Sequence, residues 1–405
     1  MAKLFFIRAS IAKTPDQATL VIKELCALQG ELLFFQKTVG NDDFTVSSLF
    51  LLEGDWDCDD AKDILNDVLT PLTTARSYCL LTDINNASLS QREMPNYSAH
   101  VITLMSDKFN LESISNLTKL LSDNKFSVCK IKNLSDKYRS IDAVEAKSLN
   151  LELHVTGSQI SQEVIRKALQ KLSNSHLIDI TIQPGRSGNF PPSLVAFDMD
   201  STLIDAEVID ELALEAGVGE QVAAITESAM RGEIDFQQSF ATRVSLLEGL
   251  SADALTAVAD RLQLNPGAEV LLKNLKYLGF KTAIISGGFT FFARHLQSRL
   301  EIDYVYANHL DIAAGAVTGK VVGEIIDGQR KAQILTEIAR REGLAVKQVV
   351  AVGDGANDLP MLGIAGLGIA YKAKPRVRAE AKQAISNNSL AAVLCILGYS
   401  EEDLL

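Results

Sequence analysis

Short apolar runs alternate with longer amphipathic stretches over the second half of the chain. Apolar runs of this length are typical of strands buried on both faces of a parallel sheet, and the stretches between them have helical periodicity. Strands that alternate with helices predict a doubly wound, Rossmann-like α/β sheet. The predicted strands are Leu194–Phe197, Lys281–Ile285, Tyr304–Ala307, Val349–Val352 and Leu367–Ala370.

One long segment interrupts this alternation between the first two strands. Residues 206–264 have helical periodicity and carry many charges. A crossover helix does not need this length, so the segment is expected to form a small helical cap over the edge of the sheet. The α/β unit, cap included, is expected to span residues 190–405.

The first 183 residues have a different pattern, which occurs twice. Each copy predicts the order β-α-β-β-α-β, which is the ferredoxin-like arrangement. A polar stretch at 85–97 separates the copies, and a second at 183–189 leads into the α/β unit. One module is therefore expected at residues 1–84 and another at 98–183.

The tandem modules resemble ACT domains, the amino-acid-sensing units of metabolic enzymes. The resemblance implies dimerisation and a site for a feedback amino acid. The glycine-rich turn of that family is not evident at residues 9–12 or 106–109. The sequence therefore leaves open whether these modules bind a ligand or only dimerise.

Composition narrows the class of protein. The chain has 405 residues, 47% of them hydrophobic, which is enough for more than one core. Its formal net charge of −12 argues against nucleic acid or an anionic membrane as a partner. Its five cysteines are scattered without C-x-x-C spacing, as expected of reduced thiols in a cytoplasmic protein. The apolar run at the N-terminus is too short for a signal peptide, and no run approaches the length of a membrane span.

Polar residues that suit phosphate chemistry follow three of the predicted strands. Asp198 and Asp200 come directly after the first strand and lead into Ser201-Thr202. Such paired charges at the end of a buried strand need a partner. The second strand leads into Ser286-Gly287-Gly288, and the fourth into a glycine-rich loop with Asp354 and Asp358. Ligands of open α/β sheets lie beyond the carboxyl ends of the strands, where these residues are expected to meet.

Phosphoryl transfer needs a nucleophile, an acid for the leaving oxygen and positive charge on the other oxygens. Asp198 suits the nucleophile, and Asp200 suits the acid that later becomes a base. A Mg²⁺ ion is expected on Asp198, Asp354 and the backbone carbonyl of Asp200. Ser286, the backbone of Gly287 and Lys331 would take the remaining phosphoryl oxygens.

The ordered motifs D-x-D-S-T, Ser, Lys and G-D-G-x-N-D resemble those of the haloacid dehalogenase superfamily of phosphohydrolases. Asp200 matters within that group, because the ion-pumping ATPases carry threonine at this position and keep their phosphoenzyme. The second aspartate therefore implies a phosphatase.

Residues 194 to about 395 resemble more closely the phosphoserine phosphatase family. This resemblance implies that Glu207 binds the substrate ammonium and that Arg243 binds its carboxylate. Taken alone, both charges would be read as solvated helix surface. The resemblance also implies that Met230 and Phe236 line the cap with apolar side chains. It places Asn357 on the phosphate side and Asp358 behind the metal and the lysine.

The predicted function is Mg²⁺-dependent hydrolysis of O-phospho-L-serine, the last step of serine biosynthesis, by a cytoplasmic homodimer with serine as a candidate feedback ligand. Two alternatives stay open. One is a phosphotransferase or a broader phosphomonoester phosphatase of the same fold. The other is an amino-acid-sensing regulator whose phosphatase domain is vestigial.

Overall fold

A computed structural model describes the chain from residue 192 to 405, except Gly232, and the earlier part in pieces. Those pieces are three N-terminal strands by their backbone, residues 100–106, single positions between 113 and 124, and residues 126–135, 149–156 and 162–185. The chain divides into two compact units. One is Met1–Gly188 with Gly398–Asp403, and the other is Asn189–Leu397 with Leu404–Leu405.

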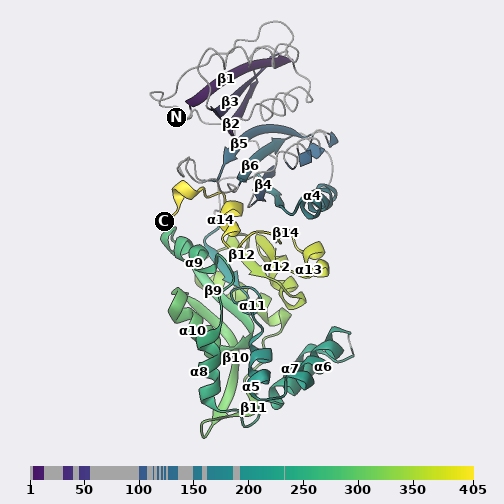
Figure 1. Cartoon of the computed structure of the whole chain (residues 1–405), viewed down its shortest axis with the longest axis vertical. Coiled ribbons are helices and arrows are strands. Elements are labelled where there is room, and N and C mark those ends of the chain that lie inside the picture. The colour runs from purple at the N-terminus through teal and green to yellow at the C-terminus, as the bar shows by residue number, and fades with distance from the viewer. Residues whose placement is uncertain are drawn as a thin grey trace. The chain divides into compact units, whose positions relative to one another are not determined.

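The second unit is built on a seven-stranded sheet with the order β11-β10-β9-β8-β12-β13-β14 (Figure 1). All neighbours pair in parallel except β10 and β11, which form an antiparallel hairpin at one edge. The strands are β8 (Leu194–Phe197), β9 (Lys281–Phe289), β10 (Tyr304–Ala313), β11 (Ala316–Val322), β12 (Val349–Gly353), β13 (Leu367–Tyr371) and β14 (Gln383–Ile385).

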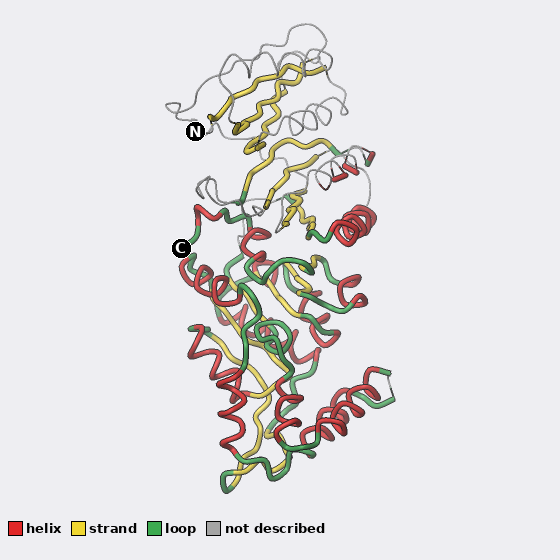
Figure 2. The backbone as a smooth tube through the Cα atoms, viewed as in Figure 1, coloured by secondary structure: helices red, strands yellow, loops and turns green. Residues whose placement is uncertain are grey.

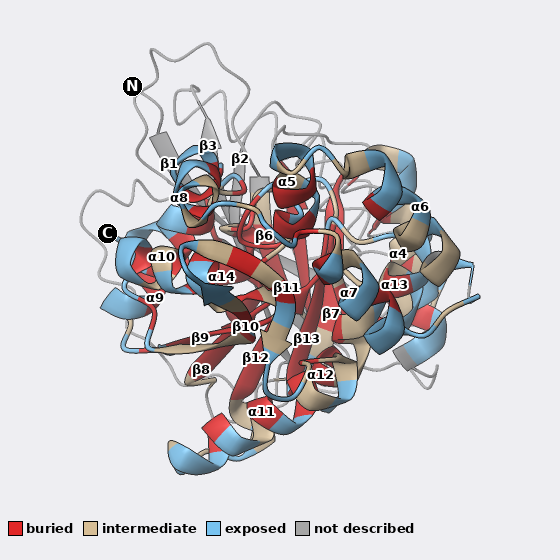
Figure 3. Cartoon of the chain, turned by 90° about the horizontal axis from the view of Figure 1, so that it is seen from below, coloured by how far each residue is buried: buried red, intermediate tan, exposed pale blue. Residues whose placement is uncertain are grey.

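Helices alternate with these strands, as the sequence pattern predicts (Figure 2). The central strands are buried (Figure 3). Leu194, Ala196 and Ile285 of the sheet pack in one cluster with Leu335 and Ile338 of the amphipathic helix α11. The helices of the sheet are α9 (Ala268–Tyr277), α10 (Thr290–Leu300), α11 (Gly328–Arg341), α12 (Leu359–Ile364), α13 (Pro375–Glu380) and α14 (Ala392–Leu397).

The segment expected to form the cap contains four helices. Two connections join this segment to the sheet, one before α5 and one after α8. They pair with each other through an antiparallel bridge between Ile204 and Leu264. Gly319 of β11 approaches the end of α7 so closely that a Cβ there would lie 3.1 Å from the carbonyl oxygen of Ser245. The four helices are α5 (Val208–Glu215), α6 (Gly219–Met230), α7 (Phe236–Ser245) and α8 (Ala252–Arg261).

Three features of the sheet differ from the sequence prediction. β9 continues to Phe289 and β10 to Ala313, where the prediction ended them at Ile285 and Ala307. The edge strands β11 and β14 were not predicted. Neither edge strand is a continuous apolar run, because an edge strand is covered by fewer neighbours than a central one.

The first unit contains a seven-stranded sheet with the order β1-β3-β2-β5-β6-β4-β7. Its second half has the order β5-β6-β4-β7, in which the first strand of the module, β4, lies between the third and the fourth. This is the strand order of a ferredoxin-like module. Antiparallel pairing of β2 with β5 joins the halves into one sheet. The described elements are β1 (Lys3–Ala12), β2 (Glu31–Val39), β3 (Thr45–Gly54), β4 (His100–Ser106), β5 (Ser127–Asn133), β6 (Leu149–Thr156), α4 (Gln162–His176) and β7 (Asp179–Pro184).

The helices and the last strand predicted for the first module lie outside the described residues, as does the linker predicted at 85–97. The kinship of either module with ACT domains stays a prediction.

Candidate active site

Asp198 follows the central strand β8, whose four residues are all buried. Its backbone N–H donates to the carbonyl of Val352 on β12 at 2.9 Å, which continues the ladder between the strands. One carboxylate oxygen accepts the N–H of Met199 at 2.7 Å. The side chain is therefore oriented by its own loop, with only 4% of the residue exposed.

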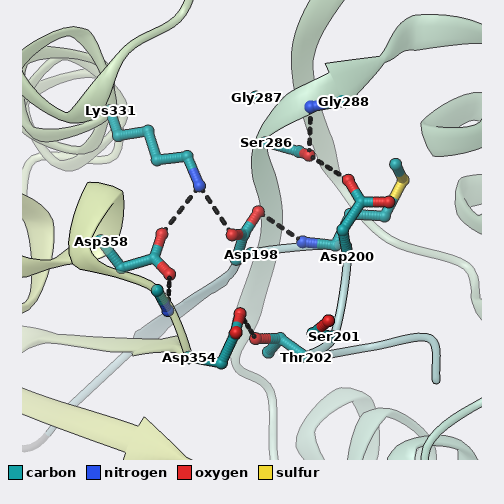
Figure 4. A network of polar contacts seen from close by, with 12 residues as sticks. Asp198, Asp200, Ser201, Thr202, Ser286, Gly287, Gly288, Lys331, Asp354 and Asp358 are labelled. Atoms are coloured by element: carbon teal, nitrogen blue, oxygen red, sulfur yellow. Dashed lines mark hydrogen bonds and ion pairs between the residues drawn. The ribbon is translucent and has the colours of Figure 1, made fainter. Parts of the chain in front are cut away.

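Lys331 reaches the same point from the first turn of α11 (Figure 4). Its Nζ lies 2.8 Å from Oδ2 of Asp198 and 2.7 Å from Oδ1 of Asp358, and the lysine is fully buried. Burial alone would lower the pKa of Lys331, but the two carboxylates more than offset that effect and raise it. Lys331 is therefore a fixed positive charge beside Asp198.

Three carboxylates crowd one side of this lysine. Oxygens of Asp198, Asp354 and Asp358 all lie within 4.8 Å of one another. Burial, and then the charge of Asp358, raise the pKa of Asp198 well above its usual value and that of Asp354 to about 7. Oxygen donors with excess negative charge suit a hard divalent cation such as Mg²⁺, so the residues fit the metal that the sequence predicts.

The side chain of Asp200 points away from the three carboxylates, toward Ser286 (Figure 4). One carboxylate oxygen accepts the N–H of Val208 at 2.9 Å, and the other accepts the hydroxyl of Ser286 at 3.3 Å. Burial, followed by the charge of Glu207, raises the pKa of Asp200 to about 7. A carboxyl group of that pKa can give and take a proton near neutrality. The metal contact predicted through the Asp200 carbonyl stays a prediction.

Ser286 and the two glycines after it lie in β9, in the part of the strand beyond its predicted end at Ile285. Ser286 is fully buried, and its Oγ accepts the N–H of Gly288 at 2.8 Å. A Cβ on Gly288 would lie 2.4 Å from Oδ2 of Asp200 and 2.7 Å from the Met199 methyl carbon. Only glycine lets this backbone pass so close to Asp200.

The loop after Asp198 is held by a residue that the sequence did not identify. The buried amide of Asn265 donates to the carbonyl oxygens of Ser201, Thr202 and Ile204 at 3.2, 2.9 and 3.1 Å. Ser201 has a left-handed backbone, with φ of 54°. In the sequence, Asn265 precedes Pro-Gly and reads as an ordinary turn, so no local pattern could find it.

Glu207 directly precedes α5, and its carboxylate accepts the hydroxyl of Ser201 at 2.8 Å. The residue is open to solvent, yet the protein around its carboxyl group raises the pKa of Glu207 through desolvation. Arg243 on α7 is half-buried, and burial lowers its pKa while Asp210 and then Glu207 act in the opposite direction. Asp210 is a second acid near Arg243 that the sequence did not identify.

Arg243 has few partners for a half-buried guanidinium. Its Nη1 lies 3.5 Å from the hydroxyl of Thr226, and its Nε is buried with no hydrogen-bond partner among the described residues. No carboxylate of the described chain lies within ion-pair distance of it. An unpaired arginine beside a solvent-facing acid can accept a ligand that carries both charges.

The remaining predicted residues lie nearby to different degrees. Phe236 is 36% exposed, stacks on Phe240, and its ring edge would be 3.7 Å from a Cβ on Gly287. Met230 ends α6, and its side chain lies outside the described residues. Asn357 belongs to the short 3-10 helix η3 (Ala356–Asp358), in the same loop as Asp354, but no hydrogen bond joins it to Lys331.

Comparisons with known proteins identify relatives of the chain. Residues 192–366 match the haloacid dehalogenase-like hydrolase family. The phosphoserine phosphatase of Archaeoglobus fulgidus is 44% identical over 254 residues, which are 63% of this chain and 74% of that protein. That of Vibrio cholerae is 48% identical over 206 residues, which are 51% of this chain and 63% of that protein.

Two solved structures extend the likeness beyond the hydrolase unit. A haloacid dehalogenase family hydrolase from Salmonella enterica serovar Typhi has a TM-score of 0.64 and 34% identity, covering 73% of this chain and 98% of that one. An unliganded probable phosphoserine phosphatase from Vibrio cholerae has a TM-score of 0.60 and 32% identity, covering 77% and 90%.

The fold and the aspartate–lysine site define a haloacid dehalogenase-like hydrolase. Within that class, the chain belongs to the phosphoserine phosphatase family. Among the described residues, no helix combines the length and apolar character needed to cross a membrane.

Proposed function

We propose that the chain hydrolyses O-phospho-L-serine to serine and phosphate through an aspartyl-phosphate on Asp198, with Mg²⁺ bound, as the last step of serine biosynthesis. The observation that carries the proposal is the joint placement of Asp198 beside Lys331 and of Asp200 beside Ser286. The first pair supplies a nucleophile next to a positive charge. The second supplies a titratable acid next to a hydroxyl that can donate a hydrogen bond to phosphate.

In the first step, a carboxylate oxygen of Asp198 attacks phosphorus and the bond from phosphorus to the serine oxygen breaks. Asp200, with a pKa of about 7, gives its proton to that leaving oxygen. Lys331, the Ser286 hydroxyl and the backbone around Gly287 stabilise the charge on the transferred group.

In the second step, Asp200 takes a proton from water, whose oxygen attacks phosphorus. The acyl-phosphate bond breaks, which releases phosphate and restores the Asp198 carboxylate. A cation held by Asp198, Asp354 and the Asp200 carbonyl would offset the repulsion between carboxylate and phosphate. Asp358 accepts from Lys331 and from the Gly355 N–H, so it holds the lysine in place.

Selection of an amino-acid substrate is proposed for the cap side of the site. The unpaired Arg243 suits the substrate carboxylate, since a guanidinium fork matches two oxygens. Glu207 suits the ammonium. Phe236 would close the apolar side of the pocket over Gly287, together with Met230. Asn357 is proposed for the phosphate side.

A phosphatase assay on phosphoserine, phosphothreonine and small sugar phosphates tests the substrate. Asp198→Asn should abolish turnover, and Asp200→Asn should lower kcat about 10²- to 10⁴-fold, as expected when an acid–base group is lost. Retained turnover in Asp198→Asn would refute the mechanism. Transfer of phosphate to added homoserine would indicate a phosphotransferase, and wild-type inactivity on the whole panel would indicate a vestigial site.

We also propose that the N-terminal modules mediate homodimerisation, with serine as a candidate feedback ligand, and that the enzyme acts in the cytoplasm. The location rests on the scattered cysteines. If the modules sense serine, a chain that starts near Ser193 should escape inhibition by serine. Unchanged inhibition would mean product binding at the active site.

A further inference from the structure

Asn308 lies where β9, β10 and the segment before α11 meet. The residue is only 3% exposed, and both ends of its side-chain amide are used. The nitrogen donates to the carbonyl oxygen of Gly287 at 2.8 Å, and the oxygen accepts the N–H of Ile326 at 2.8 Å. One side chain therefore joins two segments that are far apart in the sequence.

Each of those segments leads directly to a group on the phosphate side of the site. Gly287 lies between Ser286 and Gly288. Ile326 precedes Asp327, whose side chain caps α11 by accepting the Arg330 N–H at 2.9 Å. The backbone N–H of Lys331 then donates to the Asp327 carbonyl at 2.9 Å. A shift of Ile326 would therefore move the start of the helix that carries Lys331.

The backbone around Asn308 is itself constrained. The register between β9 and β10 shifts between Tyr306 and Asn308, so Asn308 comes to lie opposite Phe289. Irregularities of this kind re-aim side chains. The hydroxyl of Thr290 donates to the carbonyls of Ala307 and Asn308 at 2.9 and 3.1 Å, which fixes the strand at that point.

We propose that Asn308 is a positioning residue that keeps Ser286–Gly288 and Lys331 aligned as one phosphate-binding unit. The proposal rests on the proposed function, in which these groups bind the phosphoryl oxygens. An amide suits this place, because its nitrogen donates to the Gly287 carbonyl while its oxygen accepts the Ile326 N–H. A merely structural role would need the same bonds but would leave phosphate affinity unchanged once the protein is folded.

Two substitutions separate the bonds, and a matched control measures the cost of losing a buried amide. Asn308→Leu has a similar volume and removes both bonds, whereas Asn308→Asp keeps the acceptor for Ile326 and loses the donor to Gly287. The control is Asn274→Leu on α9. Asn274 is also 3% exposed, donates to the Val270 carbonyl at 2.9 Å and accepts the Leu405 N–H at 2.7 Å.

The expected result has two parts. With p-nitrophenyl phosphate as substrate, Asn308→Leu should lose about 10- to 100-fold in kcat/KM, the scale of a misplaced catalytic group. Its affinity for inorganic phosphate, measured by calorimetry, should fall about tenfold, because aligned donors are lost. The preference for phosphoserine over p-nitrophenyl phosphate should stay within about threefold, because Arg243 and Glu207 share no hydrogen-bond partner with Asn308 among the described residues. Asn274→Leu should change none of these.

Hydrogen exchange gives a readout that does not depend on activity. Asn308→Leu should lose protection at residues 286–290 and at 326–331, whereas Asn308→Asp should lose it only at 286–290. Phosphate affinity within twofold of wild type in both Asn308 variants would overturn the proposal. Equal losses of phosphate affinity in Asn274→Leu would overturn it as well.

These readouts also separate this proposal from the proposed function. A wild-type protein that cleaves p-nitrophenyl phosphate but not phosphoserine would refute the substrate assignment and leave the Asn308 comparison intact. A wild-type protein that neither binds phosphate nor cleaves either ester would refute both.

Discussion

The Nζ of Lys331 lies 2.8 Å from Oδ2 of Asp198, and neither group has appreciable contact with solvent. Asp358 shares the same ammonium at 2.7 Å. Two buried carboxylates therefore depend on one lysine, and Asp354 adds a third negative charge close by. Charges this deep persist only where partners compensate for lost hydration.

Removal of this lysine should damage stability as well as catalysis. Lys331→Met leaves two buried carboxylates without their partner, so we expect a loss of about 3–5 kcal/mol in the free energy of unfolding. Activity on p-nitrophenyl phosphate should fall about 10²- to 10³-fold, as when one preorganised charge is removed. Chemical denaturation and steady-state kinetics measure the two effects.

Lys281→Met is the matched control for this variant. Lys281 pairs with Asp303 at 3.0 Å, but its side chain is 48% exposed. An exposed pair contributes at most about 1 kcal/mol. Comparable destabilisation in the two variants would contradict the role assigned to burial at Lys331.

Asn265 should affect the loop that carries Asp200. Asn265→Ala leaves three carbonyl groups without their shared donor, which we expect to cost about 1–3 kcal/mol of stability. The kcat should fall about tenfold, because the loop also orients the acid. Asn274→Ala removes a similarly buried amide that bonds Val270 and Leu405 and none of these carbonyls, so it should lose stability but keep its kcat. A normal kcat in Asn265→Ala would show that the loop holds its shape without the amide.

The sequence predicted which residues meet at the site better than it predicted the residues that hold them there. Asp198, Ser286 and Asp354 follow buried apolar runs, and the carboxyl ends of parallel strands meet at one edge, so their convergence could be inferred. Asn265 and Asn308 give no such signal. Each acts on backbone groups from distant segments, and those partners become visible only when the chain is folded.

The predicted ends of the strands were correct where the strand is wholly apolar and wrong where polar or glycine residues belong to it. β8 lies at the centre of the sheet, and its bounds were predicted correctly because burial on both faces makes the run wholly apolar. β9 was predicted too short, because Ser286-Gly287-Gly288 resembles a turn. β10 pairs with β9 on both sides of this stretch, Tyr306 with Ile285 and Asn308 with Phe289, so the strand continues beyond it.

A divalent cation should be needed for turnover and should stabilise the site. Chelation should abolish phosphatase activity, Mg²⁺ should restore it, and Mg²⁺ should raise Tm by offsetting the repulsion among Asp198, Asp354 and Asp358. Asp354→Asn removes one of these charges. Its Tm without metal should equal or exceed that of wild type, and its response to Mg²⁺ should fall at least tenfold in apparent affinity, on the scale seen when metal-site partners are lost. A full Mg²⁺ response in this variant would exclude Asp354 as a ligand.

Arg243 should decide which phosphomonoester is preferred. Among the described residues, its buried Nε has no partner and its guanidinium makes a single hydrogen bond, a long one to Thr226. Arg243→Ala should therefore lower kcat/KM for phosphoserine about 10²-fold or more, the cost of leaving a substrate carboxylate unpaired. The kcat/KM for p-nitrophenyl phosphate, which has no carboxylate, should change less than about threefold. Arg261→Ala is the control, since Arg261 is exposed and pairs with Glu211 and Glu215. It should leave both substrates unaffected. Equal losses on both substrates in Arg243→Ala would mean that the arginine supports the cap instead of recognising an amino acid.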